Sequence, residues 1–170
     1  MLSKRQLELH HELGIPADYG AGGRPPYFAD ADELVDVGPN LVGRMQRLAP
    51  EAAARWQAMA DAAARDGVRL MIVSGFRSFD YQADLIRKKL AAGQGIDEIL
   101  RVNAAPGFSQ HHSGRALDLA TPGCRPLTEE FEDTEAFAWL GKNAADFGFS
   151  LSYPAGNPDG FVYEPWHWSL

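Results

Sequence analysis

The sequence predicts an α+β domain with antiparallel strands. Helical patterns dominate the first half of the chain, whereas short apolar or alternating segments typical of strands gather towards the C-terminus. At 170 residues, with 45% hydrophobic and 23% charged residues, the chain suits one globular domain with a single core. We therefore expect residues 1–170 to form one domain, with residues 1–49 as a helical and loop extension packed on it.

The N-terminal part contains two helical patterns. Residues 3–13 are expected to form a short helix with Leu7 and Leu13 facing inward. A loop rich in glycine and proline follows. Residues 31–48 then show a weaker helical pattern, which Gly38-Pro39 interrupts.

The clearest helix is predicted over residues 50–66, because Pro50 suits the first helical position and Gly67 suits the C-terminal cap. Residues 68–73 predict a buried strand, and residues 78–90 predict the helix that follows it. The remaining expected elements are helices over 95–101 and 134–147 and strands over 115–120, 149–153 and 161–170.

Two motifs supply the residue types of a hydrolytic metal site. His111 and Asp118 lie seven positions apart, and Glu164 and His167 lie three apart. Two imidazoles and one carboxylate suit a catalytic zinc that keeps its fourth position open for water, and the remaining glutamate suits a general base. His112 competes with His111, but adjacent side chains on an extended chain point opposite ways, so only one is expected to face the metal.

Structural roles would also account for these residues. His111 can be a loop residue and Asp118 a charge at a strand edge, while Trp166 and Trp168 can be core residues of a C-terminal edge strand. A charged aspartate inside an apolar strand is costly, however, unless it is paired or binds a metal. The metal-site interpretation is therefore the stronger of the two.

Four short motifs together resemble the VanY-like D-alanyl-D-alanine carboxypeptidases. These belong to the LAS metallopeptidases, which also include lysostaphin-type enzymes and the hedgehog signalling domain. The resemblance covers roughly residues 50–170, and its motifs occur in the family's order. The motifs are Ser74-Gly75-Phe76-Arg77-Ser78, Pro106-Gly107-Phe108-Ser109-Gln110-His111, Gly114-Arg115-Ala116-Leu117-Asp118 and Glu164-Pro165-Trp166-His167.

The resemblance implies a hedgehog/D,D-peptidase-like fold, in which a small antiparallel sheet carries the zinc site and helices flank it. It implies one zinc ion per chain, bound by His111, Asp118 and His167, with Glu164 as the catalytic base. In the family pattern the ligand stands three residues before the glycine, so His112 is expected to be an outer contact or exposed. His10 and His11 are expected to be solvated on the polar N-terminal helix.

Arg77 directly follows a predicted buried strand, where loop residues often carry function. Its guanidinium can grip a substrate carboxylate or stabilise an oxyanion, and the resemblance favours one of these roles over a surface ion pair with Asp80 or Asp84. The resemblance also places Gln82 and Ser109 at the substrate site.

The predicted function is a zinc carboxypeptidase that removes a C-terminal D-alanine from peptidoglycan stem peptides or muropeptides by cutting a D,D or an L,D bond. The N-terminal stretch lacks the apolar core of a signal peptide, which predicts a cytoplasmic protein, or a periplasmic one if a leader has been removed. A cytoplasmic enzyme would meet recycled murein tetrapeptides, which favours the L,D bond.

Two alternatives remain at this stage. One is a phage-type peptidoglycan endopeptidase, and the other is a zinc-stabilised binding module without catalysis. The presence of Glu164 argues against the binding module, because such a module needs no base.

Charge and hydropathy exclude other partners. The net charge of −7 disfavours nonspecific binding to nucleic acid or anionic lipid, and no segment is apolar enough to span a membrane. The single cysteine, Cys124, rules out an internal disulfide. The sequence carries no sign of an oligomeric state.

Overall fold

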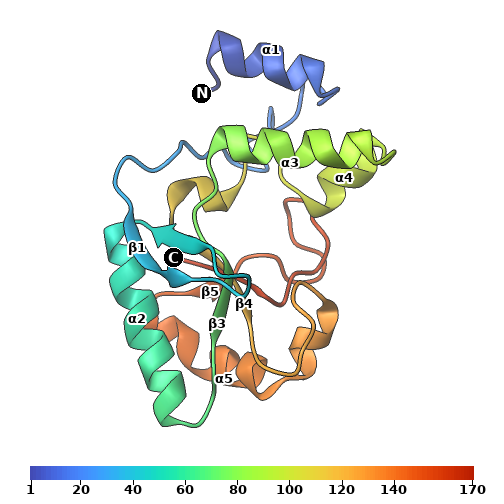
Figure 1. Cartoon of the computed structure of the whole chain (residues 1–170). Coiled ribbons are helices and arrows are strands. Elements are labelled where there is room, and N and C mark those ends of the chain that lie inside the picture. Colours follow the sequence, from blue (N-terminus) through green and yellow to red (C-terminus); the bar gives the residue numbers. More distant parts are fainter.

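The computed structural model describes residues 1–170 and has the predicted α+β architecture (Figure 1). Its centre is a four-stranded antiparallel sheet with the strand order β3-β4-β6-β5. The strands are β3 (Met71–Ser74), β4 (Ala116–Ala120), β5 (Ser150–Leu151) and β6 (His167–Ser169).

The helices expected over 3–13, 50–66, 78–90, 95–101 and 134–147 are present. The first three along the chain begin at a serine cap or at a proline, as sequence signals predict. The helices are α1 (Lys4–Glu12), α2 (Pro50–Arg65), α3 (Phe79–Ala91), α4 (Ile96–Val102) and α5 (Glu135–Asn143), with short 3-10 segments at Gln110–Ser113, Glu129–Asp133 and Ala144–Phe147. None of these helices is both long and apolar enough to cross a lipid bilayer.

Strand β4 separates the core from the functional face. Leu117 and Leu119 point into the main hydrophobic cluster, where they join residues of α2 and α5 such as Met59 and Leu140. Because strand side chains alternate, Asp118 lies on the opposite face of the sheet, as the sequence predicts. The core therefore occupies one face and leaves the other to the candidate site.

The N-terminal extension packs on the helical side of the molecule, where α1 lies across α3 (Figure 1). Leu13 joins a second hydrophobic cluster with α3 and α4, as expected. The prediction for Leu7 is wrong, since its side chain is 53% exposed. The prediction for His10 is also wrong. Its ring is buried and contacts the carbonyl of Pro106 at 2.7 Å, so tertiary packing overrides the polar character of the helix.

The helical prediction for residues 31–48 is wrong as well. The segment forms an antiparallel hairpin of β1 (Val35–Pro39) and β2 (Met45–Leu48), with an irregularity between Asp36 and Gly38. Its apolar residues recur every three or four positions and so imitate a helical period. Gly38-Pro39 is the signal that ends the first strand before the turn.

The last predicted strand is much shorter than expected. Residues 161–166 are irregular or form a turn, and only His167–Ser169 pair with the sheet. The turn closes through the His167 amide, which donates to the Glu164 carbonyl at 3.1 Å. Pro165 lies inside this turn, where it lacks the N–H that a central strand would need.

The hairpin is fixed to the loop that leaves β3. The Gly75 amide donates to Oε1 of Gln46 at 3.0 Å, and the Phe76 amide donates to the Arg47 carbonyl at 2.9 Å. A Cβ at Gly75 would come within 2.7 Å of that same carbonyl. Close backbone approach therefore explains the glycine in the Ser74–Ser78 motif.

Substitution of Gly114 can show how tightly the loop over residues 111–114 packs against the rest of the fold. Its φ is +67°, and a Cβ there would lie 2.8 Å from the Ala49 amide nitrogen. We predict that Gly114→Ala lowers stability by more than the roughly 1–2 kcal/mol that the left-handed conformation alone costs. Gly123→Ala is the matched control, because its φ is +83° but a Cβ added there would meet no atom within 4 Å. Urea unfolding should give a clearly lower free energy of unfolding for Gly114→Ala than for Gly123→Ala. Equal losses of stability in the two variants would contradict the predicted clash.

Candidate metal centre and active site

Three side chains of metal-ligand type meet on the open face of the sheet. His111 comes from the 3-10 turn before β4, Asp118 from β4 and His167 from β6. Asp118 and His167 are direct cross-strand partners, so the sheet register itself brings them together. One possible ligand atom of each residue lies within 4.8 Å of those of the other two, and all three residues are buried.

The outward nitrogen of each imidazole has a partner of its own. His111 Nδ1 lies 2.7 Å from the Gly75 carbonyl, which can only accept, so Nδ1 carries the proton. His167 Nε2 lies 2.8 Å from Oε1 of Gln110 and donates to it. In a neutral ring the second nitrogen then bears a lone pair, and here both lone pairs are on the nitrogens that approach Asp118.

In these tautomers the atoms that face one another in the centre are all acceptors, and only a shared proton or metal ion can join them. His111 Nε2 is buried without a hydrogen-bond partner and lies 3.3 Å from Oδ1 of Asp118. His167 Nδ1 lies 3.0 Å from the same carboxylate oxygen. Acceptor atoms at such short distances repel one another unless a cation is shared among them. The arrangement therefore has the character of a metal site.

Burial controls the charges in this cluster. It lowers the pKa of His111 to about 4, helped by the nearby charge of Arg77, so the ring is neutral at pH 7. Burial opposes the ionisation of Asp118, but its contacts with His111 and His167 hold its pKa well below the usual value. Neutral imidazoles and an ionised carboxylate are the protonation states that bind a metal.

Glu164 lies beside the three residues. Its Oε2 is 3.8 Å from Nδ1 of His167, and its side chain is 13% exposed. Burial and then the charge of Asp118 raise the pKa of Glu164, Arg77 lowers it, and the net pKa is about 8. A divalent cation nearby would also lower it, since positive charge favours the carboxylate. The turn at 164–167, and not the extended chain that the sequence predicted, puts Glu164 and His167 on the same side.

Arg77 faces the centre and not the surface acids proposed as alternatives. Its Nη1 lies 3.5 Å from Oδ2 of Asp118, whereas Asp84 pairs with Arg87. The Nε of Arg77 is buried without a partner, so part of the guanidinium is free for a ligand.

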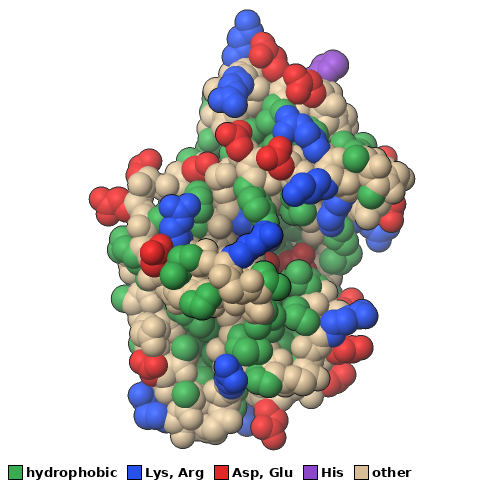
Figure 2. Space-filling view, viewed as in Figure 1, with side chains coloured by type: hydrophobic (Ala, Val, Ile, Leu, Met, Phe, Trp, Pro, Cys, Tyr) green, Lys and Arg blue, Asp and Glu red, His purple; other side chains and the backbone are tan.

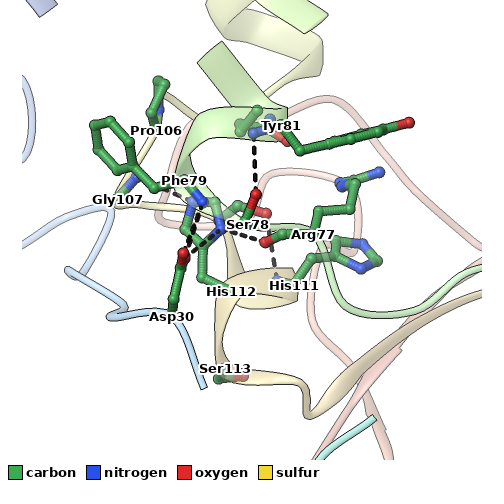
Figure 3. Close-up of polar contacts among 12 residues, drawn as sticks. Asp30, Arg77, Ser78, Phe79, Tyr81, Pro106, Gly107, His111, His112 and Ser113 are labelled. Atoms are coloured by element: carbon green, nitrogen blue, oxygen red, sulfur yellow. Dashed lines mark hydrogen bonds and ion pairs between the residues drawn. The ribbon is translucent and has the colours of Figure 1, made fainter. Parts of the chain in front are cut away.

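His112 points away from His111 and holds the Arg77 loop in place (Figure 3). Its Nδ1 donates to the Arg77 carbonyl at 2.6 Å, and its Nε2 accepts from the Gly107 amide at 3.0 Å. Asp30 of the extension lies beside this ring and accepts a hydrogen bond from the Phe79 amide at the start of α3. His112 is thus an outer contact, one of the two expected options, and it is fully buried.

Ser109 and Gln82 occupy different positions relative to the site. Ser109 lines a cavity of about 30 Å³ beside the centre, together with Arg77, Glu164 and the apolar residues Val102, Ala104, Tyr153 and Phe161. Gln82 does not line this cavity. It donates to the Ala104 carbonyl at 2.9 Å, and its buried Oε1 has no partner. Gln82 supports the cavity wall from behind.

Sequence reasoning missed two residues of the site. Gln110 orients His167, and its only signal was its place inside the Pro106–His111 motif. Tyr153 packs its ring against His167, with centroids 4.7 Å apart, and accepts the Glu164 amide through its backbone carbonyl at 3.0 Å. Gln110 is 57 positions from His167, and Tyr153 reaches the site from across an irregular loop, so spacing could not reveal these contacts.

Comparison with known proteins identifies the family. Residues 45–170 match the VanY family, described as D-alanyl-D-alanine carboxypeptidase. The chain therefore belongs to this family, and the match contains all four motifs and the three clustered ligand-type residues.

Individual relatives agree with this assignment. The putative carboxypeptidase YodJ of Bacillus subtilis is 35% identical over 120 residues, which is 69% of this chain and 44% of that protein. The chain thus spans less than half the length of this relative. Among solved structures, the LD-carboxypeptidase LdcB has a TM-score of 0.73 and 32% identity, covering 86% of this chain and 70% of that one.

A mutant of the vancomycin-resistance D,D-pentapeptidase VanY, solved in complex with Zn(II), has a TM-score of 0.62 and 26% identity. The alignment covers 85% of this chain and 80% of that one. These neighbours confirm the expected fold.

We predict that the purified protein holds about one divalent metal ion per chain, as expected for a single three-residue site. His167→Ala should lose the metal, because only two of the three converging groups remain. His11→Ala changes the same residue type on an exposed surface and should keep it. Elemental analysis after dialysis measures this directly, and full occupancy in His167→Ala would show that the ion binds elsewhere.

Proposed function

We propose that the protein is a zinc-dependent carboxypeptidase that removes a C-terminal D-alanine from peptidoglycan-derived peptides. The observation that carries the proposal is the convergence of two imidazole lone pairs and one carboxylate oxygen on a single buried point. Membership of the VanY family and the similarity to a D,D-pentapeptidase and an LD-carboxypeptidase support the substrate class.

The distances from Asp118 to the two histidines fit zinc. Ligand atoms placed tetrahedrally at about 2.0–2.1 Å from zinc lie about 3.3 Å from one another. The Asp118 oxygen lies 3.3 Å from Nε2 of His111 and 3.0 Å from Nδ1 of His167. The outward hydrogen bonds to Gly75 and Gln110 hold both rings in the tautomers that such a site needs.

When bound, zinc would supply a Lewis acid that polarises the scissile carbonyl and makes water easier to deprotonate. Glu164 lies within 3.8 Å of His167 and is the only ionisable acid beside the cluster that is not itself part of it. We assign to Glu164 the transfer of a proton from the attacking water to the leaving amine. Arg77 holds a guanidinium over the same space and stabilises negative charge on the substrate.

The cavity beside the centre suits an exopeptidase. Its volume of about 30 Å³ has room for little more than a small side chain, and the cavity is bounded by Phe161 and Tyr153. Arg77 and Ser109 on its wall can bind a free carboxylate. A space this small favours a terminal D-alanine over the continuing chain that an endopeptidase would need to accommodate. The buried base Glu164 likewise disfavours a non-catalytic binding module.

We expect Glu164→Gln to retain the metal and to lose activity by about 10²–10⁴-fold, the usual contribution of a general base. The amide keeps the shape of the side chain but cannot accept the proton. Glu98→Gln, on an exposed helix surface, should behave like the wild type. Release of D-alanine from a stem peptide and metal content should be measured together. Near-normal turnover by metal-loaded Glu164→Gln would show that Glu164 is not the general base.

Peptides with a free or an amidated C-terminus distinguish the two proposed roles of Arg77. One role is to bind the terminal carboxylate of the substrate, and the other is to stabilise the oxyanion. If its guanidinium holds the terminal carboxylate, an amidated peptide should be a poor substrate, and Arg77→Lys should be impaired because lysine lacks the planar fork. Arg65→Lys, at the exposed end of α2, is the matched control. Equal cleavage of acid and amide by the wild type would point to an endopeptidase. If wild type and Arg77→Lys reject the amide equally, Arg77 acts on the oxyanion alone.

A further inference from the structure

A second, larger groove opens on the other side of Arg77. Its volume is about 550 Å³, within the range of ligand-binding clefts, and it lies between the β1–β2 hairpin and α3. Arg77 and Asn103 line both the groove and the small cavity beside Glu164. The two spaces therefore adjoin, and an extended ligand can occupy both at once.

The groove carries positive charge without protein partners. Arg44 and Arg47 from the hairpin and Lys89 from α3 line it, and none of the three forms an ion pair or a side-chain hydrogen bond. Its only acidic residue is Asp118, which belongs to the metal centre. Figure 2 shows basic side chains around the hollow in the middle of this face. In a chain of net charge −7, such a cluster is a local exception.

One of these cations is held in place, and another is partly buried. The Arg47 guanidinium lies over the Phe76 ring at 5.7 Å from its centre, and the backbones of the two residues are hydrogen-bonded at 2.9 Å. Lys89 is half-buried, and its pKa is lowered by burial and then by the charge of Arg77. Lys89 and Arg77 are therefore near enough to repel, and an anion between them would relieve that repulsion.

Exposed apolar side chains also line the groove. Val42 and Met45 of the hairpin and Tyr81 of α3 line it and are 74%, 55% and 51% exposed. Apolar side chains next to unpaired cations fit a peptide that carries carboxylates. They fit a small inorganic anion less well, because it would leave the apolar surface uncovered.

We propose that this groove binds the part of the substrate that precedes the scissile bond, and that Arg44, Arg47 and Lys89 recognise a second free carboxylate on it. The proposal rests on the proposed carboxypeptidase function. The small cavity and the groove adjoin at Arg77 and Asn103, so residues that precede the leaving one can extend past Arg77 into the groove. The enzyme would then prefer peptides with an acidic group upstream of the terminal residues.

The test uses two synthetic peptides that both end in two D-alanines and differ only in one upstream residue, Glu or Gln. The full-length protein is compared with Arg44→Gln/Arg47→Gln. Arg65→Gln/Lys142→Gln is the control, since it removes the same charge from exposed positions outside the groove. Affinity is measured by calorimetry on the Glu164→Gln background, and KM and kcat are measured with the base intact.

We expect the Glu peptide to bind about tenfold more tightly, as for a partly desolvated charge-assisted contact. The preference should shrink as NaCl rises from about 20 to about 500 mM, because salt screens exposed charges. Arg44→Gln/Arg47→Gln should abolish the preference through KM with kcat nearly unchanged, whereas the control should keep it.

Equal affinity for both peptides in the unmodified groove, or no binding of either, would overturn the carboxylate subsite. A preference that persists in Arg44→Gln/Arg47→Gln would also overturn it. Tighter binding of the Glu peptide without D-alanine release by the metal-loaded enzyme would uphold the subsite and overturn the proposed carboxypeptidase activity. Release of D-alanine without a preference for the Glu peptide would uphold the carboxypeptidase activity and overturn the carboxylate subsite.

Discussion

The site depends on one buried carboxylate. Asp118 lies in a central strand of the sheet and is 4% exposed, a position where an unpaired negative charge costs several kcal/mol. The register of β4 and β6 sets His167 directly opposite, the turn before β4 brings His111 to the same oxygen, and Arg77 approaches the other oxygen. The Arg77 guanidinium offsets part of the cost. A cation shared by Asp118 and the two imidazoles would offset the rest.

The loop from Gly75 to Arg77 links the metal centre to everything around it. The Gly75 carbonyl fixes the tautomer of His111, and the Arg77 carbonyl is held by His112. The β1–β2 hairpin binds the same loop through Gln46. Arg77 thereby stands at the boundary between a small cavity and a wide basic groove. In the proposed function, this asymmetry would give a bound peptide one orientation, with its small terminal residue in the cavity.

The sequence determined the features that depend on local chemistry. The alternation of β4 placed Leu117 and Asp118 on opposite faces, because strand side chains have a period of two. Helix α2 begins at Pro50 and ends before Gly67, as its capping signals predict. The four motifs also identified the family and the three ligand-type residues, because their residue types and order are specific.

Only the tertiary structure decided what depends on contacts between distant segments. Residues 35–48 form a hairpin despite a helical period, because pairing and docking onto Gly75 outweigh a weak local pattern. His10 is buried by packing against Pro106, 96 positions away. The partner of His167, Gln110, and the cluster of cations in the groove likewise come from separate elements. The spacing of residues in the sequence determines which face of its own helix or strand a residue occupies. It does not determine which other helix or strand packs against that face.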